Sequence, residues 1–96
     1  MGQVAKLIEL VKTLESLDET ATIYVGEPWS SESQAVVEVE PPSGGLPPAA
    51  AGAGLKYFLE VFVARDFLTD WESGLGRSPS ARERCDRLIR YAVDDA

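Results

Sequence analysis

The chain contains no histidine, and Cys85 is its single cysteine. Without histidine, the commonest general base and the commonest zinc ligand are both missing, so Ser-His-Asp and Cys-His catalytic sites are excluded. One cysteine cannot form an internal disulfide, which favours a reducing compartment such as the cytoplasm. Cys85 falls on the apolar stripe of a predicted helix, so we expect a buried core residue rather than a nucleophile. These absences predict a protein that is not an enzyme.

Long hydrophobic runs are also missing. No stretch reaches the roughly 18 apolar residues that a membrane span needs, and the first residues lack the basic and apolar regions of a signal peptide. The glycine-rich segments 43–45 and 52–54 are not followed by the Lys-Ser or Lys-Thr of a phosphate-binding loop. We therefore expect a cytoplasmic protein that neither binds a membrane nor carries a cofactor.

Basic residues are scarce relative to acidic ones. The chain has 9 Lys and Arg against 16 Asp and Glu, a formal net charge of -7. The imbalance lies before Gly76, where 4 basic residues face 12 acidic ones. Such a field repels nucleic acid and attracts basic proteins, although ordinary solubility explains a net charge of this size equally well. The charge thus favours a basic protein as the partner.

The hydrophobic periodicity predicts six elements in one α+β domain spanning residues 1–96. Three- and four-residue spacing predicts helices over 4–17 and 64–75 and from Ser80 onward, where Ser80 and Glu83 form a predicted capping box. Alternation and β-branched residues predict strands over 22–25, 34–40 and 56–63. The expected order is α-β-β-β-α-α, a two-layer sandwich of about three mainly antiparallel strands with the helices on one face.

The segment 41–54 consists of proline, glycine, alanine, serine and one leucine. Prolines lack a backbone donor and glycines are conformationally free, so we expect a flexible loop without a regular element. Neither flank could bury a core alone, and both therefore belong to the same domain. If the loop instead made a crossover, one strand pair would be parallel.

Several side chains qualify for a binding role. Trp29 lies in a polar loop, where it is either an interface anchor or a tryptophan that folds back over the sheet edge. Asp66 and Asp70 share one helix face, which is typical of a solvated surface and only weakly indicative of a divalent metal site. Glu60 stands in the most apolar strand and needs either exposure or a basic partner such as Arg65. The arginines of the last helix alternate with acids and predict surface ion pairs.

Three segments give the chain a resemblance to the small bacterial immunity-type proteins that accompany polymorphic toxins. These segments, 23–29, 57–68 and 83–89, cover about a quarter of the sequence. The resemblance implies a stoichiometric inhibitor that occludes a toxin, and the acidic charge fits a basic, nuclease-like target.

We therefore predict an acidic protein-binding module of immunity or antitoxin type. Its expected contacts are rim charges around an aromatic anchor, from a first loop and from the helix over 64–75: Glu27, Trp29, Glu32, Asp66, Asp70 and Glu72. A self-associating structural or regulatory subunit, a homodimer formed through a strand edge or the last helix, is the alternative. A metal-dependent enzyme based on Asp66 and Asp70 is a third hypothesis.

Overall fold

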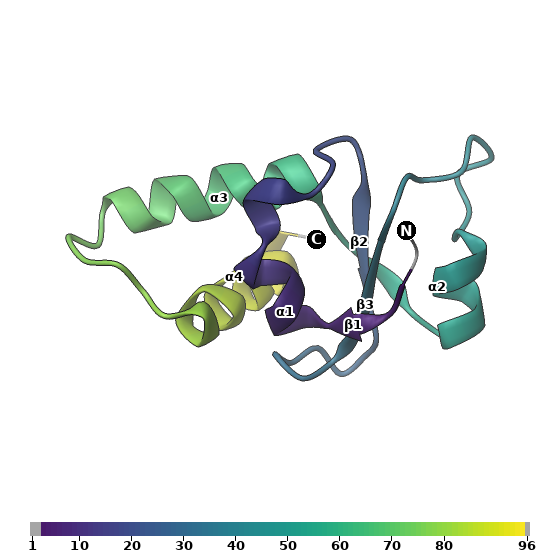
Figure 1. Ribbon diagram of the computed structural model, residues 1–96, viewed down its shortest axis with the longest axis horizontal. Helices are drawn as coiled ribbons and strands as arrows, with labels where there is room; N and C mark the ends of the chain where they lie inside the picture. Colours follow the sequence, from purple (N-terminus) through teal and green to yellow (C-terminus); the bar gives the residue numbers. More distant parts are fainter. Residues whose placement is uncertain (1–2, 96) are drawn as a thin grey trace.

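The computed structural model describes residues 3–95 and has an α+β fold built on one antiparallel sheet (Figure 1). Its elements are β1 (Ala5–Lys6), α1 (Leu7–Lys12), the 3-10 helix η1 (Leu14–Ser16), β2 (Thr22–Val25), β3 (Gln34–Glu38), α2 (Pro48–Ala53), β4 (Lys56–Glu60), α3 (Val61–Ser73) and α4 (Ala81–Asp95). The α+β class predicted from the sequence is confirmed. The predicted three strands are wrong in number, because β1 adds a fourth.

The strand order is β1-β3-β2-β4, and every pair is antiparallel. The parallel alternative for the segment 41–54 is thereby wrong. Thr22 pairs with both Glu38 and Glu60 at one end of the sheet, and Val25 pairs with Ala35 and Lys56 at the other. The sheet thus has two distinct ends, and the loops that leave each end are held about a strand length apart.

One face of the sheet carries the main core. Buried side chains of β2, β3 and β4 meet those of α1, η1, α3 and α4 there, with Leu7, Ile23, Phe58, Leu68 and Leu88 all fully or almost fully buried. Cys85 belongs to the same cluster and is completely buried, as its place on the apolar stripe of the last helix predicted. Burial raises the pKa of the Cys85 thiol to about 12.

The other face of the sheet is partly covered by α2, and Figure 1 shows this helix on the opposite side of the sheet from α1, α3 and α4. Ala50 and Leu55 pack there against Tyr24 and Val36 in a second, smaller cluster. Two predictions are corrected by this helix: the helices do not all lie on one face, and the segment 41–54 does contain a regular element.

The sequence of α2 explains why a helix forms in so proline-rich a segment. Pro48 stands in the first turn, where its fixed φ is compatible with a helix and its missing N–H costs nothing. The alanines that follow are the best helix formers. Gly54 then adopts a left-handed conformation (φ 72°), which ends the helix and directs the chain into β4.

The boundary between β4 and α3 lies earlier than the sequence predicted. The run of apolar residues over 56–63 is typical of a strand, yet Val61 already begins α3. Val61, Ala64 and Leu68 are buried at helical spacing, and this pattern prevails over β propensity. A bulge opposite Ile23 and Tyr24 also places Phe58 and Leu59 in the same core, not on opposite faces.

The N-terminal helix is shorter than the predicted 4–17. Ala5 and Lys6 pair with Ala35 and Gln34 of β3, so a short strand takes the place of the first predicted helical turn. After α1 the backbone tightens into η1, which keeps Leu14 in the core. The predicted capping box at the start of α4 is confirmed, since Ser80 Oγ accepts from the Glu83 N–H and Glu83 Oε1 accepts from the Ser80 N–H.

Candidate protein-binding surfaces

The six residues predicted to bind a partner lie in two separate parts of the molecule. Glu27, Trp29 and Glu32 belong to the loop between β2 and β3, at the end of the sheet where Val25 pairs with Lys56. Asp66, Asp70 and Glu72 belong to α3, which starts from the opposite end, at Glu60. Figure 1 shows the loop at the lower ends of the strands and α3 near their upper ends. The structure therefore does not bring the two groups together.

Trp29 is packed against the main core. Its ring meets Phe58 edge to face at a centroid distance of 4.9 Å, and its Nε1 is buried with no hydrogen-bond partner among residues 3–95. This packing favours the tryptophan that folds back over the sheet. Its outer side, with Glu27 and Pro28, still lines a groove of about 410 Å³ against the C-terminal half of α4.

Glu32 and Glu72 have basic partners within the chain. Glu32 contacts Lys6 at 2.7 Å, and this hydrogen-bonded pair lowers the pKa of Glu32 and raises the pKa of Lys6. Glu72 accepts a 2.9 Å hydrogen bond from Arg84 Nε. Ion pairs within the chain therefore account for both carboxylates without a binding partner.

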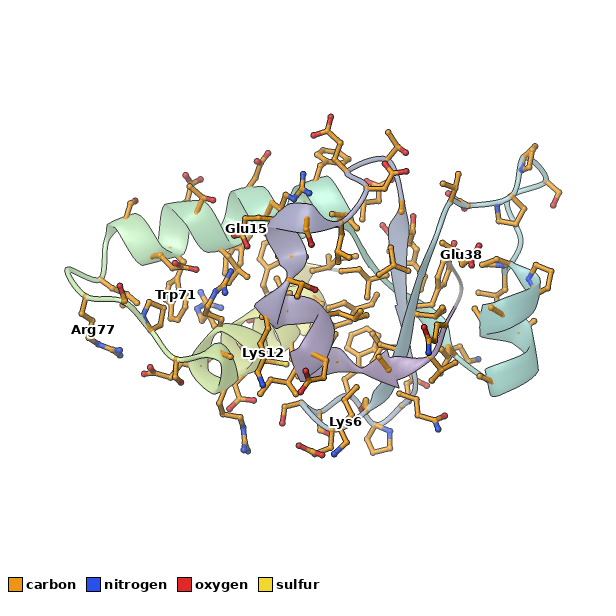
Figure 2. All side chains as sticks on the ribbon, in the orientation of Figure 1. Lys6, Lys12, Glu15, Glu38, Trp71 and Arg77 are labelled. Atoms are coloured by element: carbon orange, nitrogen blue, oxygen red, sulfur yellow. The ribbon has the colours of Figure 1, made fainter. Side chains whose placement is uncertain are left out.

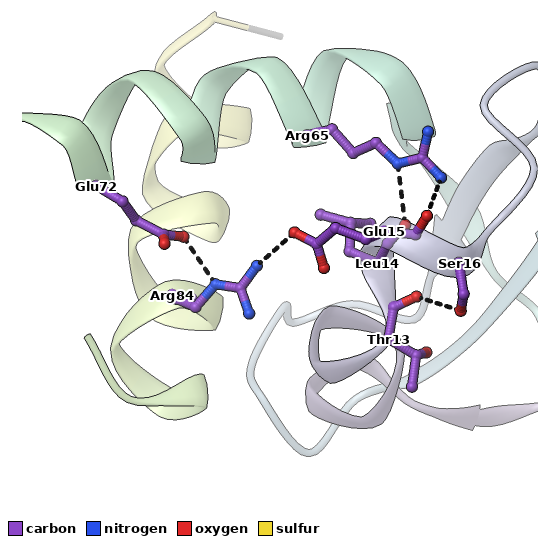
Figure 3. Close-up of polar contacts among 7 residues, drawn as sticks. All are labelled: Thr13, Leu14, Glu15, Ser16, Arg65, Glu72 and Arg84. Carbon is purple, nitrogen blue, oxygen red and sulfur yellow. Dashed lines mark hydrogen bonds and ion pairs between the residues drawn. The ribbon is translucent and has the colours of Figure 1, made fainter. Parts of the chain in front are cut away.

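Arg84 and Arg65 tie η1 to the long helices (Figure 3). Arg84 lies between Glu72 and Glu15, at 2.9 Å and 3.4 Å, and only 16% of its side chain is exposed. Arg65 donates to the backbone carbonyls of Leu14, Glu15 and Leu17. We call the part of α3 and α4 that extends from Glu72 to Arg84 the arm, and its charges are largely paired.

The surface pairs predicted for α4 are present in part. Arg82 contacts Asp86 at 3.2 Å, and Arg77 contacts Glu83 at 2.7 Å. Arg87 instead lies over the Phe67 ring, 4.9 Å from its centroid. Trp71 lies between α3 and α4, as Figure 2 shows, and is partly buried against the main core.

Asp66 lies near the turn that precedes β2. It lines a shallow pocket with Glu19, Thr20 and the half-exposed ring of Phe62. Asp70, one turn farther along α3, is exposed and belongs to no ion pair of the described residues. No group of three or more His, Cys, Asp or Glu side chains within residues 3–95 is arranged to hold a metal ion.

The end of the sheet from which α3 starts gathers six carboxylates, which we call the acidic sheet end. Thr22 is paired with both Glu38 and Glu60, Glu40 follows β3, and the turn before β2 supplies two more acids. The members are Asp18, Glu19, Glu38, Glu40, Glu60 and Asp66. Among the described residues only Glu19 has an ion-pair partner, Arg65 at 3.6 Å.

The carboxylates of the acidic sheet end raise the pKa of two tyrosines, Tyr24 and Tyr57. Burial raises the pKa of Tyr24, and the carboxylates of Glu40 and Glu38 raise it further, while the Thr22 hydroxyl acts in the opposite direction. Burial likewise raises the pKa of Tyr57, and Glu60 and Glu40 add to the effect. Figure 2 shows Glu38 on the side of the sheet that faces α2. The unpaired negative charge therefore acts on both phenols.

Five acids of this end were not among the predicted binding residues: Asp18, Glu19, Glu38, Glu40 and Glu60. A signal for Glu38 and Glu40 was present, because they are two residues apart at the end of an alternating segment and thus share a face. Glu60 joins them only because β4 lies on the far side of β2. Sequence spacing cannot indicate that adjacency.

No helix among residues 3–95 has the length and apolar character needed to cross a membrane. Comparisons with protein-family models, with curated proteins and with solved structures each produced no match. The resemblance to immunity-type proteins therefore stays a prediction.

Proposed function

We propose that this protein is an acidic protein-binding module that occludes a basic protein, in the manner of an immunity or antitoxin protein. The observation that carries the proposal is the acidic sheet end, where six carboxylates share one basic neighbour within residues 3–95. Negative charge left unpaired on one surface steers a basic protein to it and disfavours acidic competitors.

Apolar side chains accompany this charge. The side chains of Phe62 and Val39 are 48% and 58% exposed, and both lie beside members of the acidic sheet end. A binding interface typically has apolar anchors surrounded by polar residues. Of the six residues expected from the sequence, Asp66 belongs to this surface and Asp70 extends it along α3, whereas Glu32 and Glu72 are engaged within the chain.

The proposal is tested by capturing the partner from the native cell with the full chain as bait. The informative variant is Glu38→Gln with Glu40→Gln, and its matched control is Glu9→Gln with Asp86→Asn, which removes the same charge from surface ion pairs. We expect the first variant to lose most of the captured basic protein and the control to keep it. Equal capture by both variants would contradict the proposal.

The steering component has a kinetic test. The association rate of the captured partner is measured by stopped flow as ionic strength rises from well below to well above physiological levels. Screening of surface charges over a Debye length of about 8 Å at physiological salt should slow association strongly. An association rate that does not change with salt would remove steering from the mechanism.

Self-association is the second candidate function, and the edge of β4 favours it. β4 is the last strand in the order and has no neighbour on its outer side among the described residues. An unprotected edge can pair with the same edge of a second copy. Light scattering across a dilution series separates the two functions, because a stable homodimer at micromolar concentration would favour this candidate.

A further inference from the structure

The outer edge of β3 is only half occupied. Gly26 N–H donates to the Gln34 carbonyl, so Gln34, Val36 and Glu38 turn their backbone groups toward β2. Leu7 N–H donates to the Ser33 carbonyl, so Ala35 and Val37 turn theirs toward β1. β1 pairs with β3 only as far as Ala35. Within residues 3–95, no backbone group bonds Val37 from this side.

An apolar groove of about 400 Å³ runs beside this free edge on the main-core face. Its apolar lining is Val37 and Val39 of the β3 segment with Leu10, Leu17 and Ala21 opposite, and the polar residues Gln3, Ser16, Asp18 and Glu38 complete it. We call it the η1–β3 groove. A chain segment laid along Val37 would point every second side chain into this groove, because side chains alternate between the faces of a strand.

The intervening side chains of such a segment would lie near carboxylates instead of apolar side chains. Glu38 and Glu40 alternate with Val37 and Val39, and both carboxylates raise the pKa of Tyr24 on the α2 face. Neither glutamate has an ion-pair partner among the described residues. Every second side chain of the incoming segment would therefore lie next to unpaired negative charge.

We propose that the partner adds an extended segment to the β3 edge at Val37, with apolar side chains in the η1–β3 groove alternating with Lys or Arg toward Glu38 and Glu40. The inference depends on the proposed function and names the part of the basic partner that is recognised. Main-chain hydrogen bonds to Val37 supply affinity, and the alternation of apolar and basic residues supplies specificity. Charge complementarity selects a basic segment over a neutral one.

The probe is an acetylated and amidated heptapeptide in which lysine and valine alternate, Lys-Val-Lys-Val-Lys-Val-Lys. A peptide of the same composition with the three valines together is the first control. We expect the alternating peptide to bind at least about tenfold more tightly by calorimetry, with amide NMR shifts centred on Val37 to Glu40. Equal affinities, or shifts centred on Trp29, would overturn the proposal.

Two further peptides test the backbone contact without altering the protein. In an antiparallel pair the residue opposite Val37 faces the same side as Val37 and directs its N–H toward it. N-methylation of the valines should therefore reduce binding by about tenfold, whereas N-methylation of the lysines should leave it nearly unchanged. If both methylated peptides are weakened equally, the segment does not add to the edge.

A protein variant tests the charge contact. Glu38→Gln with Glu40→Gln should weaken the alternating peptide at least about fivefold, and Glu9→Gln with Asp86→Asn should not. The captured partner then separates this inference from the proposed function. If a basic partner binds but the alternating peptide does not compete with it, the edge site is wrong and the proposed function stands. If the peptide binds in the expected register but no basic protein is captured, the proposed function fails instead.

Discussion

The arm and the acidic sheet end both contain glutamates, but the two regions use them differently. In the arm, Glu72 and Glu83 each contact an arginine within 3 Å. At the acidic sheet end, Glu38, Glu40 and Glu60 contact none among the described residues. A paired carboxylate contributes to folding, whereas an unpaired one repels its neighbours and remains free to meet a partner. The location of a carboxylate, and not the total charge of -7, therefore distinguishes charge available for binding from structural charge.

The largest effect is expected at Arg65, which ties η1 to α3 and contacts Glu19 of the acidic sheet end. Replacing it by alanine would leave the carbonyls of Leu14, Glu15 and Leu17 without their charged donor. We expect Arg65→Ala to lower the free energy of unfolding by about 2 kcal/mol, since hydrogen bonds to charged groups are the stronger ones. Urea denaturation measures it. Arg65→Lys is the control and should recover part of the loss; an alanine variant as stable as the wild type would show that these carbonyls are satisfied by water.

The next effect separates the two regions directly. Removal of the Glu72 charge should destabilise the fold by about 1 kcal/mol, because Arg84 is mostly buried and loses its nearest partner. Glu38→Gln should change stability by less than about 0.5 kcal/mol, or raise it, because repulsion from Glu40 is relieved. Thermal unfolding of Glu72→Gln, Glu38→Gln and an Arg84→Met and Glu72→Gln double-mutant cycle provides the comparison. Equal losses of stability in Glu72→Gln and Glu38→Gln would contradict the distinction between paired and unpaired carboxylates.

A smaller effect concerns pH and the start of α4. Hydrogen bonds from Arg77 and from the Ser80 N–H lower the pKa of Glu83 from 4.5 to about 2. A carboxyl whose pKa is depressed by folding stabilises the folded state above its unfolded pKa, and that contribution is lost as pH falls through the folded one. The stability advantage of the wild type over Glu83→Gln should therefore be complete above about pH 5 and vanish near pH 2. Circular dichroism at a series of pH values measures it, and a constant difference would contradict the pairing.

The smallest effect is spectroscopic and concerns the acidic sheet end. Because Glu40 raises the pKa of both Tyr24 and Tyr57, Glu40→Gln should shift their ionisation to lower pH. The ultraviolet absorbance of tyrosinate during an alkaline titration reports the change. Glu9→Gln, far from both phenols in α1, should leave the curve unaltered. Identical curves for the two variants would show that the field of Glu40 is screened by solvent.

Much of the fold was predictable where neighbouring residues decide the outcome. The apolar stripe of the last helix, the capping box of Ser80 and Glu83, and the burial of Cys85 all depend on spacing within one element. The α2 helix was missed because prolines and glycines normally interrupt helices, whereas here Pro48 and Gly54 stand at its two ends. β1 was missed because two residues paired with β3 carry no periodicity of their own.

The candidate site was less predictable than the fold. Asp66 was identified from the sequence, but Glu72 was expected to face a partner and instead contacts Arg84. Trp29 was weighed between an anchor and a residue that folds over the sheet, and its packing on Phe58 favours the second role. The sequence contains the charges, but which charges are paired depends on contacts between residues as far apart as Glu15 and Arg84.

The sequence by itself determined the chemical class of this protein: an acidic α+β chain without histidine, whose two long helices and three longer strands are indicated by local periodicity and caps. Only the tertiary structure decided where that acidity is available. The antiparallel order places β4 beside β2, so Glu60 joins Glu38 across one strand, while the long helices bring Glu72 to Arg84. Electrostatic energy depends on distance in space, and distance in space is set by packing rather than by position along the chain.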